Sequence, residues 1–475
     1  MIPVFVELAT DLETPVSLYY KLVGDDIGFM LESAETGKNF GRYSFIGVKP
    51  FAIFTARAGG SEIAMDGHIR RFQETPLETL RSFMAEFKTA SLPGLPPLAG
   101  GAVGYFTYEL VGSFERVRGH KVADEVLLSE LLFCQVIVVM DHLTHSSRLL
   151  VLARPELGSD CGNVYDAAVT LLNEMKERLR QRAPATSTES RQKANGTVQS
   201  NMSKQKYMDL VEQAKEHIRA GDVFQVVISQ RLTVPLLEPP FGLYRRLRRV
   251  NPSPYMFYLN FGERQLVGAS PEMLVKLEAG HITTRPIAGT RPRGYDAADD
   301  DRLAAELLAD NKECAEHTML VDLGRNDLGR VCIPGTVTVE RFKQVEMFSH
   351  VMHIVSDVGG TVDANFGPID ALKACFPAGT LSGAPKVRAM EIIQELEGGN
   401  RGPYAGAVGY IDFHGNMDTC ITIRTMSIAD QKVTVQAGAG IVYDSVPETE
   451  YAETMHKAKA LIKVMTAEED DVGCQ

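Results

Sequence analysis

Residues 312–330 carry the most informative spacing of acidic residues in the chain. They read Lys-Glu-Cys-Ala-Glu-His-Thr-Met-Leu-Val-Asp-Leu-Gly-Arg-Asn-Asp-Leu-Gly-Arg. They are predicted to be helical, so Glu313 and Glu316, three residues apart, share one face. Near the C-terminus, Glu450 and Glu453 repeat this spacing on a second predicted helix. We therefore expect the two helices to face each other and to hold a divalent cation between their carboxylates.

These glutamates offer only oxygen ligands, and no cysteine or histidine stands at a metal-binding spacing beside them. Oxygen donors favour Mg²⁺, which often takes a carboxylate from each of two elements and completes its coordination with water and an anionic substrate. A solvated helix face is the alternative explanation of one such pair. The recurrence of the pair, with Lys457 four residues after Glu453, favours the cation site.

The composition limits the classes of protein to consider. A chain of 475 residues is long enough for two domains or one large elaborated domain. A net charge of −12 argues against a nucleic-acid partner. The longest apolar run, residues 131–140, is too short to span a membrane, and the N-terminus lacks a secretory pattern. The seven cysteines, never spaced Cys-x-x-Cys, fit a reducing compartment, so we expect a cytoplasmic protein.

Periodicity and turn residues divide the chain into an N-terminal region (1–182), a linker rich in small and polar residues (183–203) and a catalytic domain (204–475). Helices are predicted over residues 164–182, 203–221, 301–322, 385–397 and 447–465. Strands are predicted over residues 3–8, 27–31, 43–46, 51–55, 131–140, 147–153, 223–229, 404–413, 418–428 and 433–437. Residues 342–355 fit a helix or an extended segment, and residues 285–291 fit a turn.

Two glycine-bearing segments resemble each other. Residues 100–105, Gly-Gly-Ala-Val-Gly-Tyr, and residues 405–410, Ala-Gly-Ala-Val-Gly-Tyr, agree at five of six positions. Glycine in a strand allows another backbone to approach closely. The repeat therefore predicts two related strands in the core of a pseudo-symmetric sheet.

Several segments are suited to binding anions. Residues 379–386 form a glycine-rich entry to a predicted helix, where free amides and the helix dipole favour a carboxylate or phosphate. Residues 436–440 offer a backbone cradle, and Tyr404 with Arg424 can clamp a carboxylate. Glu272 follows a strand as a single carboxyl, a candidate proton donor. These features predict a dicarboxylate substrate, and no nucleotide-binding motif is present.

Taken together, the motifs resemble the chorismate-utilising enzymes, most closely their anthranilate-forming members. The resemblance is carried by residues 286–291, 316–327, 349–353, 379–386 and 450–457. It implies an α+β fold of two lobes, with antiparallel sheets in the core and helices outside. It also implies that the substrate is chorismate and that Mg²⁺ holds its ring carboxylate.

The resemblance assigns roles to individual residues. Glu316 and Glu453 would bind Mg²⁺, and Glu313 and Glu450 would support it through water. The catalytic residues would be Glu272, as the general acid, His353, in the elimination step, and Gln225, at the position that separates family members by their nucleophile. The substrate would be bound by Gly289, Thr290, Thr380, Tyr404, Arg424, Gly438, Ala439, Gly440 and Lys457.

Two positions separate the family members by their nucleophile. Relatives that activate water carry lysine where Gln225 stands, and many aminodeoxychorismate synthases carry lysine where Ala288 stands. Within this resemblance, the absence of lysine at both positions implies that ammonia attacks C2 of chorismate and gives 2-amino-2-deoxyisochorismate. This intermediate would then yield anthranilate and pyruvate. The reaction is the first committed step of tryptophan biosynthesis. The alternatives are component I of an aminodeoxychorismate synthase, in the folate pathway, and a non-catalytic amino-acid-sensing protein on the same fold.

The resemblance also implies a regulatory site and a partner. Glu32, Ser33, Pro254, Tyr255 and Met256 match a site for feedback inhibition by L-tryptophan, which Arg42 and Ser44 are expected to join. The chain contains no tryptophan, for which there are two explanations: chance or base composition, and the need to make the protein when tryptophan is scarce. No cysteine lies in a Gly-x-Cys-x-Gly turn, so we expect a separate glutamine amidotransferase subunit to supply ammonia, in a heterotetramer.

Overall fold

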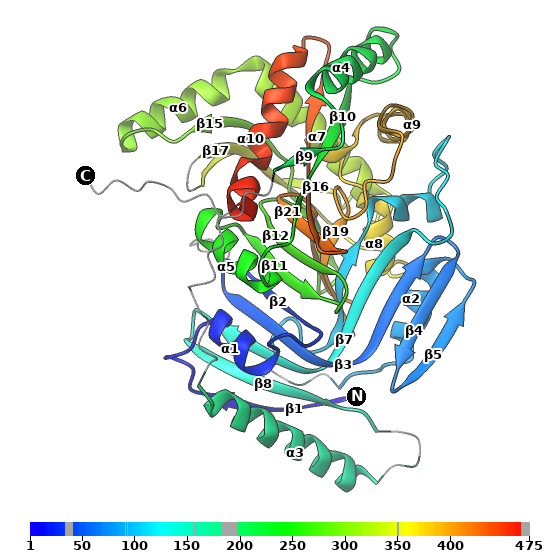
Figure 1. The fold of residues 1–475 in the computed structure, drawn as a ribbon, viewed down its shortest axis with the longest axis vertical. Coiled ribbons are helices and arrows are strands. Elements are labelled where there is room, and N and C mark those ends of the chain that lie inside the picture. The colour runs from blue at the N-terminus through cyan, green and yellow to red at the C-terminus, as the bar shows by residue number, and fades with distance from the viewer. Residues whose placement is uncertain are drawn as a thin grey trace.

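The computed structural model describes residues 1–33, 41–90, 92, 94–155, 158, 160–182, 197–348 and 351–466. It is an α+β fold with antiparallel sheets inside and helices outside, as predicted (Figure 1). Most of the predicted linker, residues 183–196, and residues 349 and 350 of one motif lie outside the described residues. The division into an N-terminal region and a catalytic domain therefore stays a prediction.

Two long strands join the sheet system. β3 (Tyr43–Arg57) and β7 (Leu127–Asp141) pair along their whole length. Each is almost wholly apolar and buried, so both faces can be covered by other elements. Each also bonds different neighbours along its two halves, β3 to β2 and β4, and β7 to β6 and β8. The β3–β7 ribbon is thus common to two branches of the sheet.

We call these branches the first and the second branch. Beyond the ribbon, the first branch runs through β2 (Gly28–Glu32), β11 (Tyr255–Asn260), β12 (Gln265–Ser270), β21 (Thr425–Ala429), β22 (Lys432–Ile441) and β10 (Gln225–Pro235). At its ends lie β8 (Ser146–Ala153), β1 (Ile2–Leu8), β9 (Gln199–Ser200) and β18 (Gly383–Ala384).

The second branch, like the first, combines strands from the N-terminal and the C-terminal parts of the chain. It runs through β6 (Gly101–Phe106), β19 (Ala407–Asp412), β20 (Met417–Ile421), β13 (Met273–Glu278), β14 (His281–Thr284) and β17 (Val351–Thr361). β17 also pairs with β15 (Ile287–Pro292) and β16 (Thr338–Met347), and the opposite edge is formed by β4 (Gly60–Met65) and β5 (His68–Phe72).

The helices flank the sheets (Figure 1). They are α1 (Pro15–Leu22), α2 (Pro76–Ala85), η1 (Tyr108–Ser113), α3 (Cys161–Arg180), α4 (Lys204–Arg219), α5 (Pro240–Val250), α6 (Ala297–Ala309), α7 (Asn311–Gly329), α8 (Pro368–Cys375), η2 (Gly379–Leu381), α9 (Lys386–Glu397) and α10 (Pro447–Thr466). Among the described residues, none of these helices combines the length and the apolar character needed to cross a bilayer.

The two branches share a hydrophobic core. Phe29, Phe45 and Phe257 of the first branch pack in one cluster with Val408 and Cys420 of the second. The N-terminal and C-terminal parts of the chain therefore close around each other.

The predicted repeat lies in this junction. Its two segments form β6 and β19, which are neighbours, with Gly104 opposite Gly409. A Cβ atom on Gly104 would lie 2.0 Å from the Glu130 carbonyl oxygen, and one on Gly409 would lie 2.1 Å from that of Asp418. The glycines are thus required by close backbone approach, as predicted.

Four predicted elements differ from the structure. The helix predicted over 301–322 is α6 followed by α7, because Asp310 breaks it and caps α7 by accepting from the Lys312 and Glu313 amides at 3.0 and 3.2 Å. The strand predicted over 418–428 is β20 and β21, interrupted where Arg424 adopts a φ of +51°. Residues 342–347 and 351–355 are extended, in β16 and β17, so the helical one of the two alternatives for this segment is wrong. Residues 287–292 form β15, with Gly289 at an irregularity rather than in a turn.

Candidate functional site

Glu272 lies in the short connection between β12 and β13, as the sequence predicts. The Thr380 hydroxyl donates to its Oε1 at 2.9 Å. Burial raises the pKa of the Glu272 carboxyl to about 7, although the Thr380 hydrogen bond and the charge of Lys457 act in the opposite direction. Glu272 is therefore a carboxyl that can hold a proton near neutral pH and release it to a bound molecule.

The two Glu-x-x-Glu pairs lie on α7 and α10. Glu316 accepts from Gln225 Nε2 at 3.2 Å. Burial raises the pKa of Glu316, and the negative charges of Glu313 and Glu453 raise it further, against the Gln225 hydrogen bond. Carboxylates from both helices therefore share one electrostatic environment, as the spacing predicted.

Basic side chains of the protein offset only part of the negative charge of these four glutamates. Lys457 lies 2.6 Å from Glu453, and Arg291 lies 3.5 Å from Glu313. Among the described residues, no three acidic, histidine or cysteine side chains converge as a ready-made metal cage. A Mg²⁺ ion that takes two carboxylates and completes its shell with water and substrate needs no such cage. The partly buried oxygen donors, whose charges repel one another, fit such an ion.

Basic groups from α10 and from the segment before β21 lie beside β22, next to this group. Lys457 Nζ donates to the Gly438 carbonyl oxygen at 3.0 Å, and Arg424 donates to the Lys457 carbonyl oxygen at 3.0 Å. A Cβ atom on Gly438 would lie 2.8 Å from the Tyr404 hydroxyl. Tyr404 and Arg424 are therefore brought together near Gly438, although neither lies within a strand.

β22 also carries Gly440, and the lack of a side chain there has a structural reason. A Cβ atom on Gly440 would lie 2.6 Å from Gln225 Nε2. Ala439 is buried between the two glycines, opposite Ile228 of β10. The absence of side chains at 438 and 440 thus leaves room for Tyr404 and Gln225.

His353 of β17 lies across from β15. Its Nδ1 is 3.0 Å from the Gly289 carbonyl oxygen and 3.0 Å from the Thr290 hydroxyl. Because a carbonyl only accepts, Nδ1 carries the ring proton and Nε2 keeps its lone pair. Burial lowers the pKa of His353, and the charge of Arg424 lowers it further. The neutral imidazole is thus a potential base close to Arg424.

A cavity of about 410 Å³ lies between the two branches. All five residues of the predicted regulatory site line it: Glu32, Ser33, Pro254, Tyr255 and Met256. Within the described part of the chain, the buried Ser33 hydroxyl has no hydrogen-bond partner. The Glu32 carboxylate is held by Arg248, at 2.6 Å, and by the Tyr244 hydroxyl. The cavity therefore offers an unpaired polar group to a ligand.

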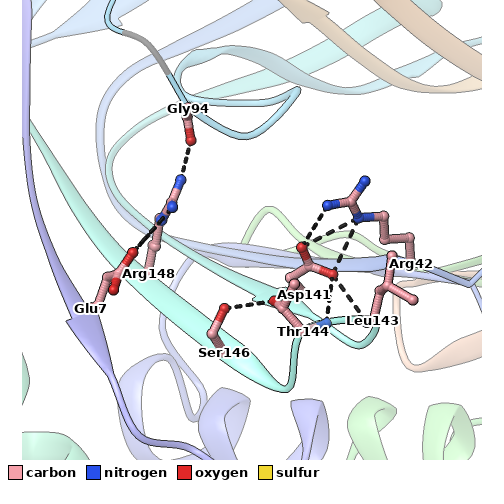
Figure 2. A network of polar contacts seen from close by, with 8 residues as sticks. All are labelled: Glu7, Arg42, Gly94, Asp141, Leu143, Thr144, Ser146 and Arg148. Atoms are coloured by element: carbon pink, nitrogen blue, oxygen red, sulfur yellow. Dashed lines mark hydrogen bonds and ion pairs between the residues drawn. The ribbon is translucent and has the colours of Figure 1, made fainter.

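The two further residues expected there behave differently. Arg42 lines the cavity, and Figure 2 shows its guanidinium directed at the Asp141 carboxylate, 2.9 Å away. Ser44 is not among the lining residues, because its hydroxyl lies 2.7 Å from His142 Nε2. The expectation for Ser44 was therefore wrong.

The sequence analysis missed the far wall of the cavity. This wall comes from the second branch and includes Met273, Lys276, Tyr410, Asp418 and Cys420. The Tyr255 hydroxyl donates to Asp418 at 3.0 Å, and burial raises the pKa of that carboxyl to about 6. Only Tyr410 carried a usable signal, as the last residue of the repeated hexapeptide.

Comparison with known proteins agrees with this arrangement. A model of the chorismate binding enzyme family matches residues 28–463. The chain belongs to this family of chorismate binding enzymes. It is 46% identical over 473 residues to anthranilate synthase component 1 of Acetivibrio thermocellus, covering 98% of this chain and 95% of the relative.

Solved structures support the same placement. Anthranilate synthase component I from Streptococcus pneumoniae TIGR4 matches with a TM-score of 0.79 and 36% identity, over 97% of this chain and 98% of that one. The menaquinone-specific isochorismate synthase of Escherichia coli matches with a TM-score of 0.73 and 20% identity, over 98% and 94%. The second match shows the shared fold alone.

Proposed function

We propose that this chain is the chorismate-converting component of an anthranilate synthase, acting in the cytoplasm. The observation that carries the proposal is the protonatable Glu272, held by Thr380 in a site that also contains a carboxylate group and the cations Arg424 and Lys457. A proton donor, a place for a cation and two anion-binding groups suit a dicarboxylate that must lose a hydroxyl. The relatives named above carry this activity in their names.

In the first step, ammonia attacks C2 of chorismate and both conjugated ring double bonds shift, so that a new double bond forms at C4. The C4–O bond breaks, and Glu272 gives its proton to the departing oxygen, which leaves as water. The product is 2-amino-2-deoxyisochorismate. Gln225 stands where water-activating relatives carry lysine, and ammonia, already a nucleophile, needs no such base.

In the second step, the C2 proton and the enolpyruvyl group are lost. The C2–H electrons complete the aromatic ring, the bond to the enolpyruvyl oxygen breaks, and that group takes up a proton to give pyruvate. The neutral Nε2 of His353 is suited to assist the proton removal. Anthranilate remains.

Glu316 and Glu453 would hold Mg²⁺, with Glu313 and Glu450 supporting it through water. The ion would neutralise the ring carboxylate and fix its position. Lys457, Thr380 and the amides of residues 438–440 would bind the same carboxylate. Tyr404, Arg424 and the Gly289–Thr290 segment would hold the enolpyruvyl side.

Two further properties belong to the proposal. A separate glutamine amidotransferase subunit would supply ammonia, consistent with relatives named as component 1 of their enzymes. L-Tryptophan would inhibit the enzyme by binding in the 410 Å³ cavity, whose size and aromatic walls suit an amino acid with an indole ring.

Incubation of the purified chain with chorismate, Mg²⁺ and ammonium tests the activity. We expect anthranilate, detected by its fluorescence, and pyruvate in equal amounts. Formation of 4-amino-4-deoxychorismate without pyruvate would instead identify an aminodeoxychorismate synthase. No consumption of chorismate, with tryptophan still bound, would identify a non-catalytic sensing protein.

A further inference from the structure

The end of strand β12 touches both the cavity and the catalytic residues. On one side, Tyr255 and Met256 of β11, which line the cavity, pair with Ser270 and Ala269. On the other side, the Ala269 amide donates to the Arg424 carbonyl oxygen at 3.1 Å. The chain then leads within two residues to Glu272. One strand end therefore lies between the two sites.

The Ser270 side chain closes a ring of hydrogen bonds around Glu272. Ser270 is fully buried, and its hydroxyl donates to the Ile421 carbonyl oxygen at 2.7 Å. The Glu272 amide makes a longer contact of 3.4 Å to the same hydroxyl. The Ile421 amide donates to the Glu272 carbonyl oxygen at 3.0 Å. The backbone that carries the acid is thus fixed by this hydroxyl from one side and by β20 from the other.

The wall between the sites is only one backbone layer thick here. Met273 pairs with Cys420, and both line the cavity. The adjacent residues, Glu272 and Ile421, line a separate cavity of about 40 Å³ that also borders Thr380. Met273 lines both cavities, so a shift of its side chain in one cavity reaches the other directly. Cys420 also directly precedes Ile421, whose carbonyl oxygen accepts from the Ser270 hydroxyl.

We propose that Ser270 is a positioning residue for Glu272, and that it transmits the occupancy of the 410 Å³ cavity to the acid. The proposal rests on the function proposed above for both sites. A ligand that moves Tyr255 or Cys420 moves the partners of Ser270. The Glu272 backbone then shifts relative to Thr380, and its carboxyl no longer meets the departing hydroxyl.

The variant Ser270→Ala tests the proposal, with Ser129→Ala as its matched control. Ser129 is equally buried and donates to the Tyr105 carbonyl oxygen at 2.9 Å, so its loss has a similar cost, and neither residue lines either cavity. We expect Ser270→Ala to lower kcat roughly five- to tenfold with little change in KM, as the loss of one buried hydrogen bond suggests. We also expect about fivefold more tryptophan to be needed for half inhibition.

Ser270→Cys, which keeps the size and a weak donor, should restore part of both effects. If Ser270→Ala matches Ser129→Ala in kcat, in the pH profile of kcat and in tryptophan sensitivity, Ser270 is only a structural residue and the proposal is overturned.

A second measurement separates this proposal from the proposed function. NMR titration of ¹³C-labelled glutamate, assigned with Glu272→Gln, follows the Glu272 carboxyl whether or not the chain makes anthranilate. We expect the Glu272 titration midpoint to change in Ser270→Ala and, in the wild type, on addition of tryptophan. A midpoint that is the same in Ser270→Ala and Ser129→Ala would refute the positioning role, even in a chain without activity.

Discussion

The 410 Å³ cavity and the catalytic site lie between the same two branches, but their acidic side chains differ in how far they are paired. In the cavity the acidic groups have partners, since Glu32 meets Arg248 and Asp418 accepts from Tyr255. In the catalytic site the carboxylates of α7 and α10 raise one another's pKa. A site that only binds can be completed by its own residues. The site that we propose for a cation and a dianion keeps carboxylates whose mutual repulsion a bound cation would relieve.

The largest effect is expected for Glu272→Gln, which keeps the shape but cannot give a proton. We expect kcat to fall about 10²- to 10⁴-fold, the range for a general acid. Tryptophan binding, measured by calorimetry, should persist. Glu395→Gln, the same change at an exposed position of α9, should leave kcat unchanged. A variant Glu272→Gln with wild-type kcat would remove the acid from the mechanism.

The same variant carries a stability prediction. Folding raises the pKa of Glu272 from its ordinary value to about 7, so the native state binds more protons than the unfolded state between pH 4.5 and 7. The free energy of unfolding therefore falls as pH rises through that window. Glu272→Gln removes this penalty, and chemical denaturation at pH 8 should find it more stable than the wild type.

A smaller effect is expected from the metal ligands. Glu316→Gln should raise the Mg²⁺ concentration for half-maximal activity on the order of 10²-fold, and Glu313→Gln about tenfold, because water-mediated support contributes less than a direct ligand. Calorimetric titration of Mg²⁺ in the presence of chorismate measures independently which of the two variants binds Mg²⁺ more weakly. Equal effects of the two variants would show that the comparison between direct and supporting carboxylates is wrong.

The pH dependence should be more modest. Because Glu272 acts in its protonated form and has a pKa of about 7, kcat should decline above pH 7 and at pH 8 be about tenfold below its plateau at low pH. Tryptophan binding, which is coupled to Glu272 only through Ser270, should change less over the same range. A kcat that rises through pH 8 would mean that another group donates the proton.

The smallest effect is expected in the cavity, where charges are already paired. Ser33→Ala should weaken tryptophan binding by about five- to tenfold, the cost of one hydrogen bond, and leave kcat unaltered. Ser44→Ala is the matched control, since Ser44 does not line the cavity. Unchanged tryptophan affinity in Ser33→Ala would mean that the unpaired hydroxyl does not serve the ligand.

Local sequence signals predicted much of this arrangement. The spacing of Glu313 and Glu316 required only a helix, and the repeated hexapeptide predicted β6 and β19, because glycine in a strand has a backbone cause. The helix break at Asp310 was missed, since an aspartate that caps one helix looks like a polar residue within a longer one. The Arg424 turn was missed because its positive φ is imposed by the surrounding fold.

The far wall of the cavity could not be predicted at all. Lys276, Asp418 and Cys420 meet Glu32 and Ser33 only because the two branches close around a common core. Such contacts depend on strand order, and no local pattern encodes strand order. The family resemblance identified the wall formed by residues 32–33 and 254–256. It did not indicate which residues form the opposite wall.

The β3–β7 ribbon has a consequence for how the chain can be divided. A fragment of residues 1–182 would keep β2 and β6 but lose β11 and β19, the strands that pair with them. A fragment of residues 204–475 would expose the same two edges from the other side. Each half therefore leaves strand edges unpaired that the other half completes. Co-expressed as separate polypeptides, they should assemble into one active particle, as two halves of a split protein do.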